Sequence, residues 1–241
     1  MRVLDLSFHE PAVNLALDEV LLDSAERGRA GECLRFWECP VPFVVLGVSQ
    51  KVQEEVCEDA CQRDGVPILR RCSAGGCVLQ GPGSLNFSLV LSYERGPALR
   101  NIRESYCYIL CRIRERLATR GVRASLEGIA DLAVDGRKVS GNAQKRRKSF
   151  VLHHGTVLYR VDALAMGRYL KEPRDRPAYR GNRPHESFVS VLPLGSDELR
   201  RAVREAFDAP EVTVEPLPDE LAEARMLAQE KYLNPAWTLR R

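Results

Sequence analysis

The chain has 241 residues, a length that one domain of ordinary size accounts for. Its apolar fraction of 44% and charged fraction of 29% are typical of globular proteins and exclude a fibrous or low-complexity chain. The formal net charge of +3 does not demand a nucleic-acid partner, although it is compatible with docking on an acidic protein. No run could span a bilayer, and residues 1–10 carry charges where a signal peptide needs an apolar core, so we expect a cytoplasmic protein.

The sequence contains 8 cysteines. Without a secretory signal, an even number of cysteines does not imply disulfides. Two pairs, Cys57 with Cys61 and Cys107 with Cys111, have the i, i+4 spacing of one helix face, but no histidine lies close to either in sequence. We therefore interpret the cysteines as small buried residues and not as metal ligands.

The first third of the chain predicts one long helix and several short elements. Apolar residues recur with helical spacing over residues 10–26, and Pro11 lies near the first turn of this amphipathic helix. The elements expected next are strands over residues 34–38 and 43–47, a helix over residues 52–63 and a strand over residues 66–70.

The rest of the chain alternates strands and helices around one dominant helix. The longest periodic segment, residues 100–120, should be the main helix behind a sheet. The other expected elements are strands over residues 85–91, 131–134 and 150–159, helices over residues 161–170, 196–207 and 218–232, an N-cap at Ser196 and a flexible loop over residues 174–184. This order predicts an α+β (mixed α/β) fold with a largely antiparallel sheet flanked by helices.

Residues 69–91 contain two small-residue turns. Arg70 and Arg71 precede the first turn, which ends at Gly75 and Gly76, and the second turn follows at residues 81–83. Glycine lets a ligand approach the main chain closely, and free N–H groups beside two guanidinium groups could bind an anion such as phosphate. A plain hairpin has the same appearance, so this stretch alone does not decide the function.

A second stretch, residues 135–159, predicts a hairpin with polar strands. Asp135 and Gly136 form a strong turn signal. Lys138 follows the turn, and the returning strand carries His153 and His154. Most lysines are simply solvated, but Lys138 is followed by small or hydrogen-bonding residues that an inert strand seldom carries. These residues are Ser140, Gly141, Asn142 and Gln144.

Together these stretches resemble the lipoate-protein ligase branch of the biotin/lipoate protein ligase and octanoyltransferase superfamily. That family carries the segments R-R-x-S-G-G-G-A-V, G-N-L-N-F-S, D-G-R-K-I-S-G-x-A-Q and L-H-H-G-T. Their counterparts here are residues 70–78, 83–88, 135–144 and 152–156, in the same order and at matching spacing. The resemblance covers nearly the whole chain. It implies one class II biotin/lipoate ligase-like catalytic domain over residues 1–241, without the accessory domain of many lipoate ligases.

The resemblance implies a two-step reaction. Lipoate would react with ATP, in the presence of Mg²⁺, to give lipoyl-AMP, and a lysine of an apo lipoyl-carrier domain would then displace AMP. That carrier would be an E2 subunit or a glycine-cleavage H-type protein. A separate accessory-domain chain could be a further partner, whereas no membrane or nucleic-acid partner is implied.

The resemblance also assigns site residues. Lys138 would be the catalytic residue that holds the carboxylate and later the acyl oxygen, because a compact ammonium can contact carboxylate and phosphate together. Asp131 is the candidate Mg²⁺ ligand. The implied nucleotide- and lipoate-binding residues are Arg70, Arg71, Ser73, Gly75, Gly76, Cys77, Val78, Leu79, Asn86, Asp131, Lys138, Ser140, Gly141, Gln144 and His154.

The chain departs from the ligase pattern in the glycine turn. Ala74 replaces the first glycine, and Leu79-Gln80-Gly81 replaces the usual Y-H-D, so any contact made by that histidine is lost. The nearest alternative is an octanoyl or lipoyl transferase that acts without ATP and uses a cysteine nucleophile upstream of the lysine. Residues 122–129 contain no cysteine, which favours the ligase. Cys77 could substitute, although we interpret it as an apolar filler.

A non-enzymatic function stays open as a third alternative. The fold could serve as a cofactor- or nucleic-acid-binding module, with the basic residues 145–148 as its contact surface. We interpret this cluster first as a solvated hairpin tip and second as a contact with an acidic protein. The loop typical of biotin ligases, G-R-G-R-x-x-R, is not found.

Overall fold

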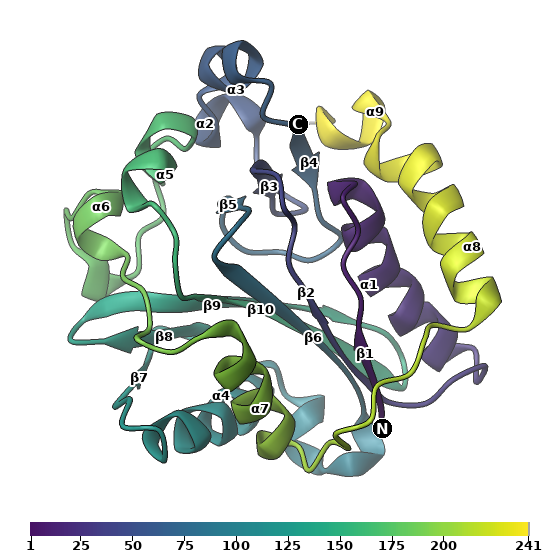
Figure 1. Ribbon diagram of the computed structural model, residues 1–241. Coiled ribbons are helices and arrows are strands. Elements are labelled where there is room, and N and C mark those ends of the chain that lie inside the picture. Colours follow the sequence, from purple (N-terminus) through teal and green to yellow (C-terminus); the bar gives the residue numbers. More distant parts are fainter. Residues whose placement is uncertain (241) are drawn as a thin grey trace.

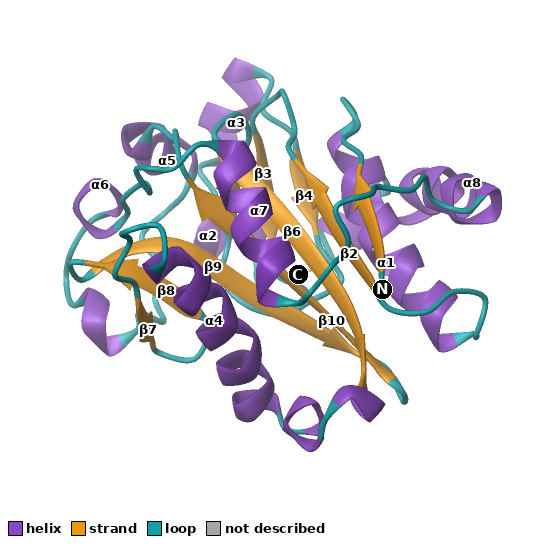
Figure 2. Ribbon diagram, turned by 60° about the horizontal axis from the view of Figure 1, so that its bottom comes forward, coloured by secondary structure: helices purple, strands orange, loops and turns teal. Residues whose placement is uncertain are grey.

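The computed structural model describes residues 1–240 and contains two sheets (Figures 1 and 2). The larger has seven strands in the order β1-β2-β6-β10-β9-β8-β7. Their bounds are β1 Arg2–Asp5, β2 Cys33–Trp37, β6 Ser84–Ser92, β10 Phe150–Leu158, β9 Arg137–Arg146, β8 Asp131–Val134 and β7 Ser125–Glu127. Within it only β1 and β2 pair in parallel, so the prediction of a largely antiparallel sheet flanked by helices is confirmed.

The smaller sheet has three strands in the order β4-β3-β5, namely Ile68–Arg70, Phe43–Leu46 and Val78–Gln80. Strand β3 pairs in parallel with β4 and antiparallel with β5. The turn of residues 71–77 joins β4 to β5, so the small sheet fixes both ends of the predicted glycine-rich turn.

Helices cover both faces of the large sheet (Figure 1). Along β6, Leu85, Phe87, Leu89 and Leu91 pack into the core formed with α4 (Ile102–Ala118) and α7 (Ser196–Ala206). The alternate residue Val90 belongs to the opposite core, with α1 (Pro11–Glu26) and α8 (Pro218–Leu227). Since successive side chains of a strand point to opposite faces, Asn86 and Ser88 face the α1 side of the sheet.

Short elements surround the small sheet. They are α2 (Val52–Glu55), α3 (Glu58–Asp64), α5 (Ala163–Tyr169), α6 (His185–Phe188) and α9 (Pro235–Thr238). Elsewhere, 3₁₀ turns lie at Tyr93–Arg95, Pro97–Arg100 and Ala178–Arg180, and a π-helical turn at Ala228–Tyr232 continues α8. Among the described residues, no helix combines the length and apolar character needed to cross a membrane.

Several sequence-based predictions need correction. The single helix expected over residues 52–63 is two helices, because Val56 is extended and forms a bridge with Leu170. Gly195, not Ser196, is the N-cap of α7, because Glu198 accepts from the Gly195 N–H while the Ser196 hydroxyl donates to Glu38. Strands β1, β5 and β7 were not predicted from the sequence.

Two surface interpretations also change. The eight cysteines are free thiols, but Cys107 is exposed, and its sulfur lies 3.4 Å from that of Cys111 on α4. Burial is therefore the wrong prediction for this pair. In the basic cluster only Lys148 is exposed. Arg147 Nε lies 2.8 Å from the Asp23 carboxylate of α1, so the tip is not simply solvated.

Candidate active site

One row of paired residues crosses the α1 side of the large sheet. Trp37 of β2 is paired with Asn86 of β6, Asn86 with Thr156 of β10, Thr156 with Gly141 of β9, and Gly141 with Asp131 of β8. Directly paired residues share a face of the sheet. With strands about 4.8 Å apart, the backbones of Trp37 and Gly141 are separated by roughly 14 Å.

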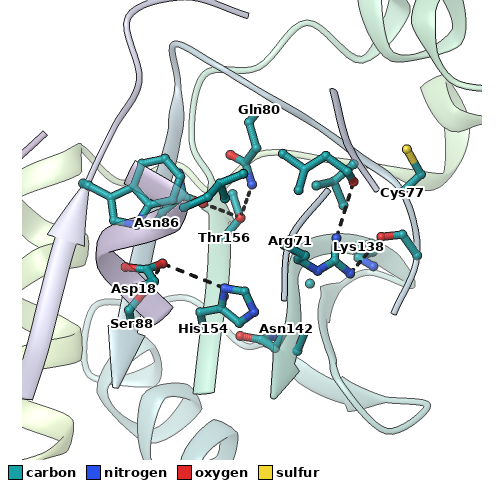
Figure 3. A pocket seen from close by; sticks show the side chains of 18 residues that line it. Asp18, Arg71, Cys77, Gln80, Asn86, Ser88, Lys138, Asn142, His154 and Thr156 are labelled. Carbon is teal, nitrogen blue, oxygen red and sulfur yellow. Dashed lines mark hydrogen bonds and ion pairs between the residues drawn. The ribbon is translucent and has the colours of Figure 1, made fainter. Parts of the chain in front are cut away.

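A pocket lies over this row (Figure 3). Its remaining walls come from α1 and from the glycine-rich turn with β5. The lining residues are Leu15, Asp18, Trp37, Val45, Arg71, Gly76, Cys77, Val78, Gln80, Asn86, Ser88, Lys138, Gly141, Asn142, Ala143, His154, Gly155 and Thr156. A second, more apolar hollow shares Cys77, Lys138 and Gly141 with the first and continues past Leu79 and Phe188, so the two adjoin.

Lys138 reaches the site because of a β-bulge. Pairing between β8 and β9 shifts between Leu132 and Ala133, which inserts one extra residue into β9. This shift lets Lys138 and Gly141, three residues apart, share one face. A Cβ at residue 141 would lie 2.8 Å from the Lys138 Nζ, so any larger residue would displace the end of the lysine side chain from this position.

The Lys138 ammonium forms an ion pair with Asp131. Its Nζ lies 2.8 Å from Asp131 Oδ1, and the Tyr179 hydroxyl donates to Asp131 Oδ2 at 2.8 Å. Both oxygens of the Asp131 carboxylate are thus occupied by protein groups. Among residues 1–240, no group of three or more His, Cys, Asp or Glu side chains could hold a metal ion. Asp131 therefore offers no free oxygen to a metal ion in this conformation, and its role as a Mg²⁺ ligand stays a prediction.

Arg71 supports the glycine-rich turn from inside. Its Nη2 donates to the carbonyls of Ala74 (2.7 Å) and Gly76 (3.0 Å), and its Nε donates to Ser73 Oγ at 3.0 Å. Gly75 has a φ of 97°, in the left-handed region that glycine adopts easily. The guanidinium lines the pocket while also maintaining the shape of the turn.

Arg70, unlike Arg71, points away from the pocket and binds the C-terminal helix α9. Its Nη2 donates to the carbonyl of Thr238 at 2.7 Å and its Nη1 to that of Gln50 at 2.6 Å. In return, the Trp237 indole donates to the Arg70 carbonyl at 2.8 Å. Arg70 is buried and does not line either hollow, so the structure does not bring the two guanidinium groups together as an anion cradle.

His154 connects the glycine-rich turn to α1. Its Nε2 lies 2.6 Å from Ser73 Oγ, and its Nδ1 lies 4.0 Å from Asp18 Oδ2. Asp18 in turn binds the buried guanidinium of Arg35 at 2.6 Å and accepts from Ser88 at 2.7 Å. Burial lowers the pKa of His154 to about 4, so its imidazole is neutral near pH 7.

The adjacent His153 faces the opposite side of the sheet. It contacts Gln144 at 3.2 Å and stacks on Phe87 with ring centroids 5.9 Å apart. Burial lowers its pKa to about 3. The predicted site residues Gln144 and Ser140 line neither hollow, and the same holds for Arg70, Ser73 and Gly75.

We expect His153 and His154 to make stability pH-dependent. In the unfolded chain their pKa is near the ordinary value of 6.5, so the unfolded state binds more protons than the folded state between that value and about 4. The free energy of unfolding should therefore fall as the pH decreases from 7 to 5, as measured by urea unfolding. The decrease should be smaller in His153→Gln and unaltered in the exposed His9→Gln. A constant free energy over this interval would contradict the prediction.

Sequence reasoning found part of this site. Arg71, Gly76, Cys77, Val78, Asn86, Lys138, Gly141 and His154 line the first pocket, and Leu79 lines the second. It missed Asp18, Trp37, Gln80, Ser88 and Thr156. A signal existed for Ser88 and Asn86, because they are polar residues that alternate with leucine and phenylalanine in a buried strand. Trp37 carries no such signal.

Comparison with known proteins agrees with this architecture. Residues 10–208 match the family model described as the lipoyl protein ligase A/B catalytic domain. Octanoyltransferase LipM of Geobacillus kaustophilus (strain HTA426) is 30% identical to the chain and is aligned over 100% of this chain and 98% of LipM. Lipoate-protein ligase LplJ of Bacillus subtilis (strain 168) is 28% identical, over 77% of this chain and 54% of LplJ.

Solved structures show the same fold. A bi-partite lipoate protein ligase of Thermoplasma acidophilum, studied with its E2 lipoyl domain, superposes with a TM-score of 0.84 at 24% identity, covering 99% of this chain and 95% of that one. A lipoate-protein ligase A bound with ATP also gives a TM-score of 0.84 at 24% identity, covering 99% and 98% of the two chains.

Proposed function

Because the chain belongs to the lipoyl protein ligase A/B catalytic-domain family, we propose that it is an enzyme that joins a lipoyl-type acyl group to a lysine of a lipoyl-carrier domain. The observation that carries this proposal is the Lys138 ammonium, held by Asp131 over Gly141 where the two hollows meet. A fixed cation at the mouth of a pocket suits a reaction in which negative charge develops on an acyl oxygen.

In the proposed reaction, Lys138 hydrogen-bonds the acyl carbonyl oxygen. The amine of the acceptor lysine attacks the carbonyl carbon, a C–N bond forms, and the bond from that carbon to the leaving group breaks. The amine releases its proton to solvent, and the leaving group departs with the bonding electrons. Asp131 positions the Lys138 ammonium throughout, and Tyr179 fixes the carboxylate by occupying its second oxygen.

We place an ATP-independent acyl transfer first, with an octanoyl or lipoyl thioester as the donor. The curated relatives that cover nearly the full chain support this choice, because they are octanoyltransferases. The ATP-dependent ligation expected from sequence becomes the second candidate. It is favoured by the absence of a cysteine from residues 122–129, where the transferases would need one. In that reaction AMP is the leaving group, and the adjoining hollow beside Arg180 is the proposed nucleotide site.

The intact mass of an apo lipoyl-carrier domain separates these candidates. The carrier is incubated with the protein and either an octanoyl-carrier-protein thioester alone, or lipoate or octanoate with Mg²⁺ and with or without ATP. We expect an octanoyl-sized gain with the thioester alone. A gain only from free acid with ATP would assign the ligase reaction instead. No gain from any donor would overturn the proposed function.

We expect Cys77→Ala to keep acyl transfer within about tenfold of the unsubstituted protein. Cys77 lines both hollows, but burial raises the pKa of its thiol to about 12, although the Arg71 charge opposes that increase. A neutral thiol is a poor nucleophile at pH 7. The rate of carrier acylation measures this outcome. An octanoyl adduct on Cys77, found by peptide mass analysis together with a transfer loss above about a hundredfold, would contradict it.

A further inference from the structure

Two cysteine side chains meet on the solvent face of α4. The Sγ atoms of Cys107 and Cys111 lie 3.4 Å apart, and both residues are free thiols. Cys107 is exposed and Cys111 is half-buried, so small solutes can reach the pair from solvent. The helix buries a different stripe of residues, namely Ser105, Ile109, Leu110, Ile113 and Leu117.

A direct disulfide does not fit this pair. Residues i and i+4 of an α-helix keep their Cβ atoms about 5–6 Å apart, because the helix fixes the backbone on both sides. A disulfide requires a Cβ separation of about 3.5–4.5 Å. Oxidation to a disulfide would therefore distort α4, whereas one atom inserted between the two sulfurs would leave the helix unchanged.

The separation of the sulfurs indicates which kind of atom could bridge them. Two bonds of about 2.3 Å, the length of a zinc–thiolate bond, enclose an angle of about 95° when they end on sulfurs 3.4 Å apart. Three-coordinate centres with a lone pair, such as trivalent arsenic, have angles close to this value. Structural zinc takes four ligands in a tetrahedron, and among residues 1–240 no third His, Cys, Asp or Glu completes a metal-binding group here.

We propose that Cys107 and Cys111 form a surface site that chelates trivalent arsenic, either as arsenite or as a monosubstituted organoarsenical. Each thiol replaces one hydroxide of the arsenic: an As–S bond forms, an As–O bond breaks, and the thiol proton leaves with the hydroxide as water. Two water molecules are released, arsenic stays trivalent, and no oxidant or reductant is consumed. The third position of the arsenic keeps its hydroxide or its organic group.

The protonation state of the pair suits this exchange. Burial raises the pKa of the Cys111 thiol, and its contact with Cys107 acts in the same direction. A protonated thiol is a poor ligand for a metal ion that needs a preformed thiolate. The hydroxide of the arsenic removes the proton as water during the exchange, so a neutral thiol does not prevent binding.

The proposed site is separate from the candidate active site. Helix α4 packs against the face of the large sheet opposite α1 (Figure 1). The pocket with Lys138 lies on the α1 side, so arsenic bound on α4 would not compete with an acyl substrate. The proposal goes beyond the proposed function and does not depend on it.

Intact mass under non-denaturing conditions tests the proposal, with phenylarsine oxide as the probe. The protein is incubated with one equivalent of the probe and an excess of glutathione, a monothiol that displaces arsenic from single cysteines. We expect one phenylarsenic group to be retained per chain and to map to the tryptic peptide of residues 104–112, which contains both cysteines. No retained group, or a group that maps to the other six cysteines, would overturn the proposal.

Two single variants decide whether both sulfurs bind. Cys107→Ser and Cys111→Ser each leave one thiol, and loss of the second attachment should weaken binding by a factor of about 10² to 10⁴. Circular dichroism verifies that each variant stays folded. Full affinity in either variant would overturn the proposal, because a single thiol would then be enough.

Cys57→Ser is the matched control for these variants. Cys57 and Cys61 have the same spacing in sequence, but Cys57 is the N-cap of α3 with a non-helical backbone, and Cys61 is buried. The variant should therefore retain the phenylarsenic group with unchanged affinity. A loss as large as that of Cys107→Ser would place the arsenic on α3 and would contradict the assignment to α4.

Discussion

Lys138→Ala should lower the rate of carrier acylation by about two to three orders of magnitude, the loss typical of removing one group that stabilises a developing oxyanion. The fold should persist, because the ammonium lies at the mouth of a pocket and its side chain is 27% exposed. The initial rate of mass gain on the carrier, with circular dichroism of the variant, measures both parts of this prediction.

Lys145→Ala is the matched control for Lys138→Ala. Both lysines lie on β9, but Lys145 lines neither hollow. Its substitution should leave the acylation rate within about twofold, as is usual for a surface change away from the site. If both variants lost the same acylation rate, β9 would act as a basic binding surface, and Lys138 would have no specific role. Full activity of Lys138→Ala would rule out its proposed role.

Arg35→Met is expected to destabilise the protein by about 3–5 kcal/mol, the cost of leaving one partner of a buried ion pair uncompensated. The Arg35 guanidinium is fully buried and lies 2.6 Å from Asp18. It also donates to the Asn14 carbonyl at 2.8 Å and to the Leu6 carbonyl at 3.0 Å. Urea unfolding of the variant measures the change in the free energy of unfolding.

Arg29→Met provides the comparison for Arg35→Met. Arg29 pairs with Glu223 on the surface, where water compensates for a lost partner. Its substitution should change the free energy of unfolding far less than Arg35→Met does. If both variants lost a similar free energy of unfolding, the Asp18 carboxylate left by Arg35→Met would be solvated by water, and the prediction would be wrong. Because Asp18 lines the pocket, Arg35→Met should also reduce acyl transfer.

The sequence predicted the fold class and the pocket residues near Lys138 better than the pocket residues near Trp37. Short contiguous motifs contain Lys138, Gly141 and His154, so the sequence around each residue indicates its chemical role. The row from Trp37 to Asp131 depends on the register of five strands, and pairing between distant strands is set by tertiary packing rather than by local pattern.

The bulge in β9 marks a second limit of sequence reasoning. Strict alternation would put Lys138 and Gly141 on opposite faces, so their contact cannot be read from the spacing. The two neighbouring arginines show a third limit. Arg70 and Arg71 are chemically alike, yet one anchors α9 and the other shapes the glycine-rich turn, because the strand directs successive side chains to opposite sides.

The hydrogen bonds between Arg70 and residues 237–238 have a consequence for synthesis of the chain on the ribosome. Arg70 immediately precedes the arginine that shapes the glycine-rich turn, yet its partners Trp237 and Thr238 are translated more than 160 residues later. A nascent chain can form the central hairpins early, since their contacts are local. The turn gains its final anchorage only when the last helix docks, so competence to bind substrate should arise after translation of that helix and not during elongation.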